Sequence, residues 1–215
     1  MKWKVCGLKD PDNIALVLEG VQPDYIGLIF YPHSPRFVGN LSPKCLPNFP
    51  EQTKKVGVFV NQSVEEIYRL AQEYGLDLLQ LHGKESPKFC DTIRNKVRLP
   101  IIKAFSVGNE FDFSWLQEYE VDFFLFDAAG KNYGGNGISF DWQVLQYYYL
   151  SQPFFLSGGI GLEQVPLLSS LHFPSLHAID VNSRFEISPG FKDPLLLKKF
   201  SHELEKIRTA PQNQR

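Results

Sequence analysis

Short apolar runs and amphipathic segments alternate along most of the chain. Eight runs have the length of a buried β-strand, and most of the segments between them have helical spacing of their apolar residues. A continuous apolar run is typical of a strand that is covered on both faces, as in a parallel sheet. The eight predicted strands are residues 3–6, 25–30, 55–60, 78–81, 100–104, 123–126, 153–157 and 177–181.

Helix boundaries are clearest between the third and fourth apolar runs. Ser63 can cap a helix and Glu66 stands at the capping-box position, while Gly75 supplies a stop. We expect further helices to begin at Ser86-Pro87, at Asp141-Trp142 and at Pro194. Three prolines in residues 39–50 predict a short or irregular segment after the second run.

Connections of this length return the chain in the same direction, so the strands should pair in parallel. The first and last runs begin at Trp3 and His177, seven units apart, which gives about 25 residues per βα unit. The sequence therefore predicts a single-domain (β/α)8 TIM barrel over residues 1–208, with a flexible C-terminal tail at 209–215. The alternative is a doubly wound open sheet, which usually has five or six strands.

Composition narrows the class of protein. The 215 residues are 43% hydrophobic and 21% charged, as in ordinary globular proteins, and the formal net charge is −2. We therefore expect no nucleic-acid partner and no membrane partner. Cys6, Cys45 and Cys90 form no C-x-x-C motif, and the N-terminus lacks the apolar core of a signal peptide, so we expect a cytoplasmic protein.

Polar residues and glycines follow nearly every predicted strand, at the end where barrel enzymes carry their chemistry. Gly158-Gly159 follows the seventh strand, and Asp180, Asn182 and Ser183 come at the end of the eighth. Two adjacent loops of this kind favour a phosphate site built from backbone N–H groups. The alternative for Gly158-Gly159 is a tight turn with no ligand.

Four side chains at other strand ends could act on a substrate. Cys6 and Asp127 are candidates for a catalytic role, although an apolar-flanked cysteine is more often inert and Asp127 could simply have a partner or a solvent-exposed position. His82 could be structural, and Arg36 could be a surface charge or a carboxylate ligand. No two histidines have metal-ligand spacing, so we predict no metal site.

Seven segments together carry a family resemblance. They are KVCGLKDPDNI from Lys4, GLIFYPHSPRFV from Gly27, KVGVFVN from Lys55, LLQLHGKE from Leu78, LFDAAGKNYGGNGISFDW from Leu125, FLSGGI from Phe155 and DVNSRFEISPGFKD from Asp180. In this order they resemble phosphoribosylanthranilate isomerase, a barrel enzyme of tryptophan biosynthesis. The resemblance implies an intramolecular aldose–ketose isomerase that needs no cofactor and converts N-(5-phosphoribosyl)anthranilate to a 1-deoxyribulose 5-phosphate by an Amadori rearrangement.

The resemblance also implies residue roles. Cys6 is expected to be the general base, Asp127 the general acid and Arg36 the contact for the anthranilate, with His82 lining the pocket. Gly135, Gly158, Gly159, Asp180, Asn182 and Ser183 fall where the family binds its phosphorylated substrate. Four positions depart from the family pattern. Asn136 stands in the usual GGTG and Ile138 where a lysine is common, while Asn182 replaces a serine and Arg184 a glycine in the phosphate loop.

Two other functions stay open at this stage. One is another sugar-phosphate barrel isomerase, which would share the phosphate site but use a different acid–base pair. The other is a non-catalytic barrel that binds a phosphorylated ligand, although binding alone needs neither Cys6 nor Asp127. We expect a monomer or a homodimer.

Overall fold

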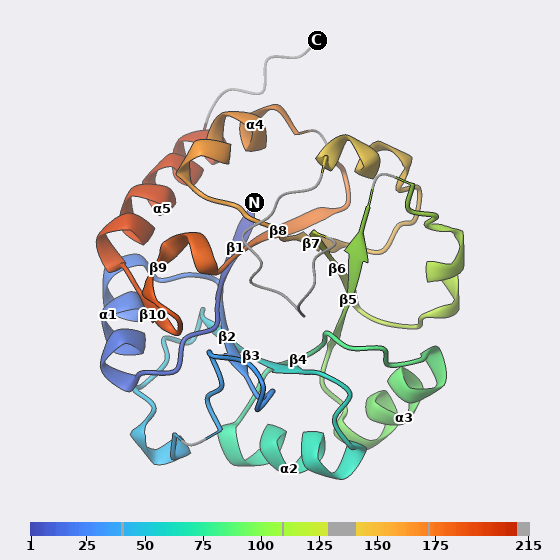
Figure 1. Ribbon diagram of the computed structural model, residues 1–215, viewed down its shortest axis with the longest axis horizontal. Coiled ribbons are helices and arrows are strands. Elements are labelled where there is room, and N and C mark those ends of the chain that lie inside the picture. The colour runs from blue at the N-terminus through green and yellow to red at the C-terminus, as the bar shows by residue number, and fades with distance from the viewer. Residues whose placement is uncertain (40, 109, 129–140, 172, 210–215) are drawn as a thin grey trace.

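Eight parallel strands close into a barrel in which each strand pairs with its neighbour in the sequence and β1 pairs with β8 (Figure 1). The structure is a computed structural model that describes residues 1–39, 41–108, 110–128, 141–171 and 173–209. The predicted (β/α)8 barrel and all eight predicted strands are confirmed. The strands are β1 (Lys2–Cys6), β2 (Tyr25–Ile29), β3 (Lys54–Phe59), β4 (Leu78–Leu81), β5 (Ile101–Val107), β6 (Phe123–Ala128), β7 (Phe154–Leu156) and β8 (Leu176–Val181).

Helices form where the sequence carries caps. Ser63 accepts a hydrogen bond from the Glu66 backbone N–H, and Gly75 ends that helix in the left-handed conformation at φ 56°, so the predicted boundaries of α2 are confirmed. Ser86 caps α3 in the same way. The α-helices are α1 (Pro11–Val21), α2 (Val64–Tyr74), α3 (Pro87–Val97), α4 (Val165–Ser170) and α5 (Pro194–Thr209).

In three connections the described residues contain a 3-10 turn where a regular barrel would have a full α-helix. The described part of the proline-rich segment forms only η1 (Pro43–Cys45), as its composition predicts. Asp141 does cap a helix, but η3 (Trp142–Tyr147) is a 3-10 helix rather than the expected α-helix. The remaining 3-10 turns are η2 (Ser114–Glu118), η4 (Leu162–Gln164) and η5 (Ser183–Phe185).

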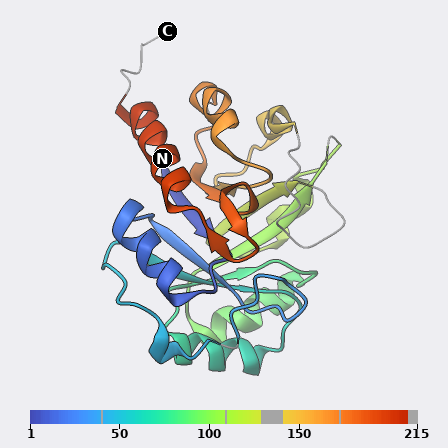
Figure 2. The ribbon, with the colours of Figure 1, turned by 60° about the vertical axis from the view of Figure 1, so that its left-hand side comes forward.

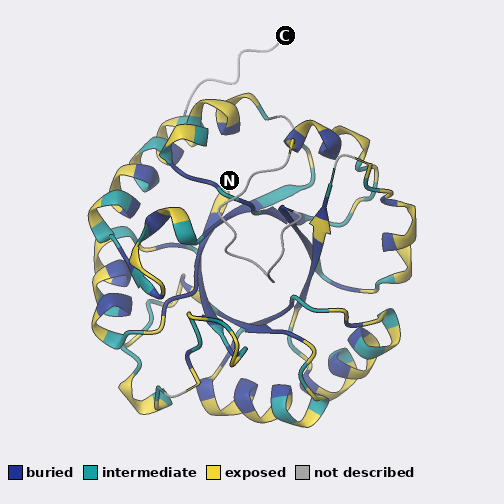
Figure 3. Ribbon diagram, in the orientation of Figure 1, coloured by how far each residue is buried: buried dark blue, intermediate teal, exposed yellow. Residues whose placement is uncertain are grey.

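Apolar side chains form two layers, one inside the barrel and one between the strands and the helices. The inner layer consists of Tyr25, Val56, Leu78, Ile102, Ala104, Leu125, Phe155 and Ala178. The larger outer layer receives the alternate strand residues, such as Trp3 and Val5. Figure 3 shows the result: the strands are buried, and the helices expose their outer faces. This packing fills the barrel toward the amino-terminal ends of the strands and leaves the carboxyl-terminal ends for polar residues.

A short antiparallel hairpin follows β8 and is not among the predicted elements. It consists of β9 (Glu186–Ser188) and β10 (Phe191–Lys192), and it lies beside α1 (Figures 1 and 2). The Asn13 side chain holds it there, because its Nδ2 donates to the Lys192 carbonyl (2.9 Å) and its Oδ1 accepts from the Lys192 N–H (2.7 Å). The hairpin thus ties the end of the barrel to its beginning.

The C-terminal helix runs one residue further than the expected domain boundary. Thr209, the first residue of the expected tail, belongs to α5, and its hydroxyl donates to the Glu205 carbonyl. Residues 210–215 of the expected tail lie outside the described residues. In the part of the chain that the structure describes, no helix combines the length and apolar character needed to span a bilayer.

Candidate active site

A pocket opens among the carboxyl ends of the barrel strands. It contains six of the residues predicted from the sequence, which come from five different βα units: Cys6, Arg36, His82, Asp127, Asp180 and Asn182. The other lining residues are Ile29, Tyr31, Ser34, Val58, Val60, Gln80 and Ser157. The structure therefore brings the two proposed proton-transfer groups, Cys6 and Asp127, into one cavity.

Cys6 is the last residue of β1 and is buried. Its neighbour across the sheet is Gly27 of β2, where a Cβ atom would lie only 2.6 Å from the Cys6 Sγ. A side chain at position 27 would therefore displace the sulfur. Burial raises the pKa of the Cys6 thiol, and the neighbouring Lys4 ammonium opposes this rise.

Lys4 lies two residues before Cys6 on the same face of β1 and is fully buried inside the barrel. Its Nζ donates to both oxygens of Asp180 on β8, at 3.0 Å each. Burial alone would lower the pKa of Lys4, but Asp180 and Cys6 outweigh burial and raise it. The ammonium is thus kept charged next to the thiol.

Asp127 projects from β6 and its Oδ1 accepts a hydrogen bond from the Ala128 N–H (2.9 Å). Its Oδ2 lies 3.5 Å from Nε2 of His82. The amide of the buried Gln80 donates to Nδ1 of His82 (2.7 Å), which assigns the ring proton to Nε2, on the side of Asp127. Gln80 and His82 therefore hold a donor toward the Asp127 carboxyl.

Gly158 and Gly159 adopt positive φ angles of 97° and 63°, which favour glycine at both positions. A Cβ atom at Gly158 would lie 2.9 Å from the Ala128 backbone nitrogen and 3.4 Å from Asp127 Oδ1. The loop after β7 thus passes directly over the end of β6, and Gly158 shapes the surroundings of Asp127.

The end of β8 and the loop after it contribute in two ways. The Asp180 side chain, on β8, is engaged with Lys4 inside the barrel. Asn182 lines the pocket, and Ser183 begins η5 directly after it. Gly158, Gly159 and Ser183 are not among the residues that line the pocket, and Gly135 lies outside the described residues.

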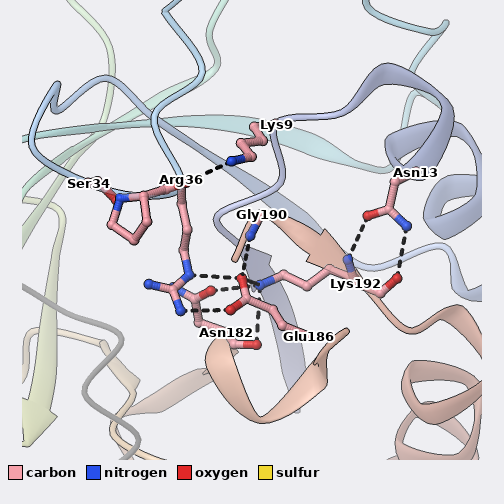
Figure 4. A network of polar contacts seen from close by, with 9 residues as sticks. Lys9, Asn13, Ser34, Arg36, Asn182, Glu186, Gly190 and Lys192 are labelled. Carbon is pink, nitrogen blue, oxygen red and sulfur yellow. Dashed lines mark hydrogen bonds and ion pairs between the residues drawn. The ribbon is translucent and has the colours of Figure 1, made fainter. Parts of the chain in front are cut away.

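Arg36 is held by a residue that the sequence analysis does not single out. Its Nε donates to Glu186 Oε1 (2.8 Å) and its Nη2 to Glu186 Oε2 (2.7 Å) (Figure 4). Lys192 Nζ also donates to Glu186 Oε1 (2.8 Å). Burial lowers the pKa of Lys192 to about 8, against the attraction of Glu186.

Five residues of this region are not among those predicted from the sequence. They share positions inside or beside strands, where a charged, amide or glycine residue interrupts an apolar pattern: Lys4, Gly27, Gln80, Glu186 and Lys192. A lysine or glutamine within a strand that is otherwise buried needs a polar partner, and that signal is present in WKVC and LLQL. Among the described residues, no group of three or more His, Cys, Asp or Glu side chains is placed to hold a metal ion.

Known proteins resemble this chain over nearly its full length. The family model described as N-(5'phosphoribosyl)anthranilate (PRA) isomerase matches residues 3–203. An N-(5'-phosphoribosyl)anthranilate isomerase of Parabacteroides distasonis is 43% identical over 205 residues, which are 94% of this chain and 92% of that protein.

Two solved structures share the fold. A phosphoribosyl anthranilate isomerase from Thermus thermophilus superposes with a TM-score of 0.85 at 26% identity, over 97% of this chain and all of the other. Another, in complex with reduced 1-(o-carboxyphenylamino)-1-deoxyribulose 5-phosphate, gives a TM-score of 0.79 at 29% identity, over 95% of this chain and 98% of the other. With the barrel and the full-length matches together, this chain belongs to the N-(5'-phosphoribosyl)anthranilate isomerase family.

Proposed function

We propose that this protein isomerises N-(5'-phosphoribosyl)anthranilate to 1-(o-carboxyphenylamino)-1-deoxyribulose 5-phosphate in tryptophan biosynthesis. The observation that carries the proposal is that Cys6 and Asp127, from β1 and β6, line one pocket together with Arg36. Membership of the family supports the same substrate. An acid and a base that approach a sugar from two sides of a closed barrel suit an aldose–ketose isomerisation.

The reaction needs two positioned proton transfers. Asp127 protonates the ring oxygen of the ribose, the C1–O bond breaks, and the anilino nitrogen shares the resulting positive charge as an iminium ion. Cys6 then removes the proton from C2 to give an enolamine. The enolamine takes up a proton at C1 and its C2 hydroxyl loses one, which yields the ketone.

Cys6 must be a thiolate to act as this base. A free cysteine with a pKa near 8.5 is only about 3% ionised at pH 7. The buried Lys4 ammonium, fixed by Asp180, favours the ionised form, and the iminium charge of the intermediate adds to it. We therefore assign to Lys4 and Asp180 the task of keeping a positive charge beside Cys6.

Two loops are proposed to bind the phosphate group. Gly158 and Gly159 follow β7, and Asn182 and Ser183 follow β8, at the end of the barrel where the pocket opens. Neighbouring loops after the last two strands are the usual phosphate site of this fold. The positive φ angles at the two glycines let backbone N–H groups point out of the loop. His82 is proposed to orient Asp127.

The test uses two single variants, Cys6→Ala and Asp127→Asn, followed by the loss of anthranilate fluorescence as substrate is converted. Each should lower kcat by about 100-fold or more, which is the smaller effect of losing a general acid or base. Cys45→Ala is the matched control, because this thiol is exposed and lies outside the pocket. Turnover near the wild-type rate in both site variants would reject the assignment.

A further inference from the structure

Glu186 accepts hydrogen bonds from only one edge of the Arg36 guanidinium, the edge made by Nε and Nη2. The contacts at Nε (2.8 Å) and Nη2 (2.7 Å) form a two-pronged ion pair, and Figure 4 shows Nη1 on the side away from Glu186. An arginine presents five N–H donors in a planar fork, so the opposite edge, made by Nη1 and the second Nη2 proton, can bind another carboxylate. Arg36 lines the pocket, where such a carboxylate would arrive.

Glu186 is itself fixed from three directions. Its Oε1 also accepts from Lys192 Nζ (2.8 Å) and from the Gly190 N–H (3.0 Å), and only 6% of its side chain is exposed. Burial alone would raise the pKa of Glu186, but Arg36 and Lys192 outweigh burial and lower it to about 2. Glu186 is therefore a carboxylate throughout the neutral pH range.

The hairpin that carries Glu186 is anchored to the barrel. Lys192 Nζ donates to Oδ1 (2.6 Å) and to the backbone carbonyl (3.2 Å) of Asn182, which lines the pocket. The stem of Arg36 is packed as tightly, since a Cβ atom at Gly7 would lie 2.7 Å from Arg36 Cδ and 2.8 Å from Asn182 Oδ1. The guanidinium is thus restrained at both its stem and its inner edge.

We propose that Glu186 is a positioning residue for the aromatic carboxylate of the substrate, acting through Arg36. This inference rests on the proposed function. Arginine side chains have many rotamers, and a guanidinium fixed before binding loses less entropy when the carboxylate arrives. The β9–β10 hairpin then serves substrate recognition, beyond what barrel closure requires, because β1–β8 close the barrel without it.

The experiment measures how strongly a single carboxyl group contributes to binding. Calorimetry compares two ligands, reduced 1-(o-carboxyphenylamino)-1-deoxyribulose 5-phosphate and its phenylamino counterpart that lacks the carboxyl group. In Glu186→Gln the first ligand should bind about 10- to 100-fold more weakly, the scale of a misplaced contact. The affinity for the second should change by less than about twofold, since this ligand lacks the carboxyl group that Arg36 is proposed to bind. KM should rise with the first Kd while kcat stays close to wild type.

One further variant is a control, and another replaces Glu186→Gln if that protein does not fold. Glu73→Gln removes a carboxylate from an exposed Glu–Arg pair on the outer face of α2 and should leave both affinities unchanged. Should Glu186→Gln fail to fold, Glu186→Asp keeps the charge but is one methylene too short to hold both nitrogens, and the same separation of the two ligands is expected.

Equal weakening of both ligands, or no weakening of either, would overturn the role of Glu186. The wild-type protein separates this failure from failure of the proposed function. If wild type binds the two ligands equally well, Arg36 does not recognise the carboxylate. If wild type prefers the carboxylated ligand and Glu186→Gln keeps the same preference, only the contribution of Glu186 is ruled out.

Discussion

Gly27 determines where the Cys6 sulfur can lie. It faces Cys6 across β1 and β2, and the space that its missing side chain leaves is filled by Cys6 Sγ and by the stem of Lys4. Any Cβ atom there would meet Sγ at 2.6 Å and Lys4 Cε at 3.1 Å. A glycine inside a strand often marks such a close approach, and here it makes room for the proposed base.

Gly27→Ala should therefore weaken both folding and turnover. We expect a loss of about 1 to 3 kcal/mol in the free energy of unfolding, as for other overpacked cores, measured by urea denaturation. We also expect kcat to fall about tenfold or more because the sulfur is displaced.

The control for this substitution is another glycine in an ordinary backbone conformation. Gly20 lies in α1, where a Cβ atom would point into open space, so Gly20→Ala should stabilise the protein by about 0.5 to 1 kcal/mol. Wild-type kcat in Gly27→Ala would contradict the role of this glycine.

Strands and helices follow from the pattern of the sequence to different degrees. The eight strands are predictable because their apolar runs are continuous and regularly spaced, and α2 and α3 because Ser63, Ser86 and Gly75 are strong boundary signals. The 3-10 form of η3 is not predictable, since Asp141 can cap both kinds of helix. The hairpin escapes prediction because β9 and β10 have only three and two residues.

The candidate site shows a similar division. Cys6, Arg36, His82 and Asp127 can be found because they lie at or after strand ends, and a barrel gathers strand ends. Lys4 and Glu186 cannot be assigned, because their partners Asp180 and Arg36 lie 176 and 150 residues away in the sequence. The register of β1 and β8 brings Lys4 to Asp180, and the hairpin after β8 brings Glu186 to Arg36.

Three neighbouring strand ends are joined by one buried lysine. Lys103 of β5 donates to Glu85 Oε2 (3.0 Å) and to the carbonyls of Leu81 and Gly83 (3.2 and 2.8 Å). Glu85 in turn accepts from the Asn61 N–H after β3 (2.8 Å). Both charged side chains are 2% exposed, so each depends on the other.

Lys103→Met should cost about 3 to 5 kcal/mol in the free energy of unfolding, because it leaves the Glu85 carboxylate buried without its counter-charge. Urea denaturation gives this value. The double variant Lys103→Met/Glu85→Gln removes both charges and should recover a clear part of the loss. A double variant no more stable than the single one would show that the ion pair is not the cause.

The beginning and the end of the barrel are joined at two places. The pairing of β1 with β8 closes the sheet, and the contact of Asn13 with Lys192 joins α1 to the hairpin. The Asn13 amide satisfies both the N–H and the carbonyl of Lys192, and both residues are fully buried. This contact also fixes the backbone of the lysine that supports Glu186.

Asn13→Ala should lower the free energy of unfolding by about 2 to 4 kcal/mol, since two buried backbone groups lose their partners. Denaturation in urea measures the change. Asp12→Ala, at an exposed position in the same turn of α1, should stay within about 0.5 kcal/mol of wild type. Comparable stability of the two variants would mean that the Asn13 bonds contribute little.

The long sequence separation of two ion pairs, Lys4 with Asp180 and Arg36 with Glu186, has a consequence for protein synthesis. When a ribosome has made the first half of the chain, Lys4 and Arg36 have emerged without the acids that neutralise them, because Asp180 and Glu186 are still to be translated. Burying an ammonium group without a counter-charge costs free energy. The nascent chain is therefore not expected to fold stably before β8 has been made. The pocket is therefore expected to form only in the last steps of translation. Truncated chains that end before β8 should not reach the native fold and should be sensitive to proteolysis.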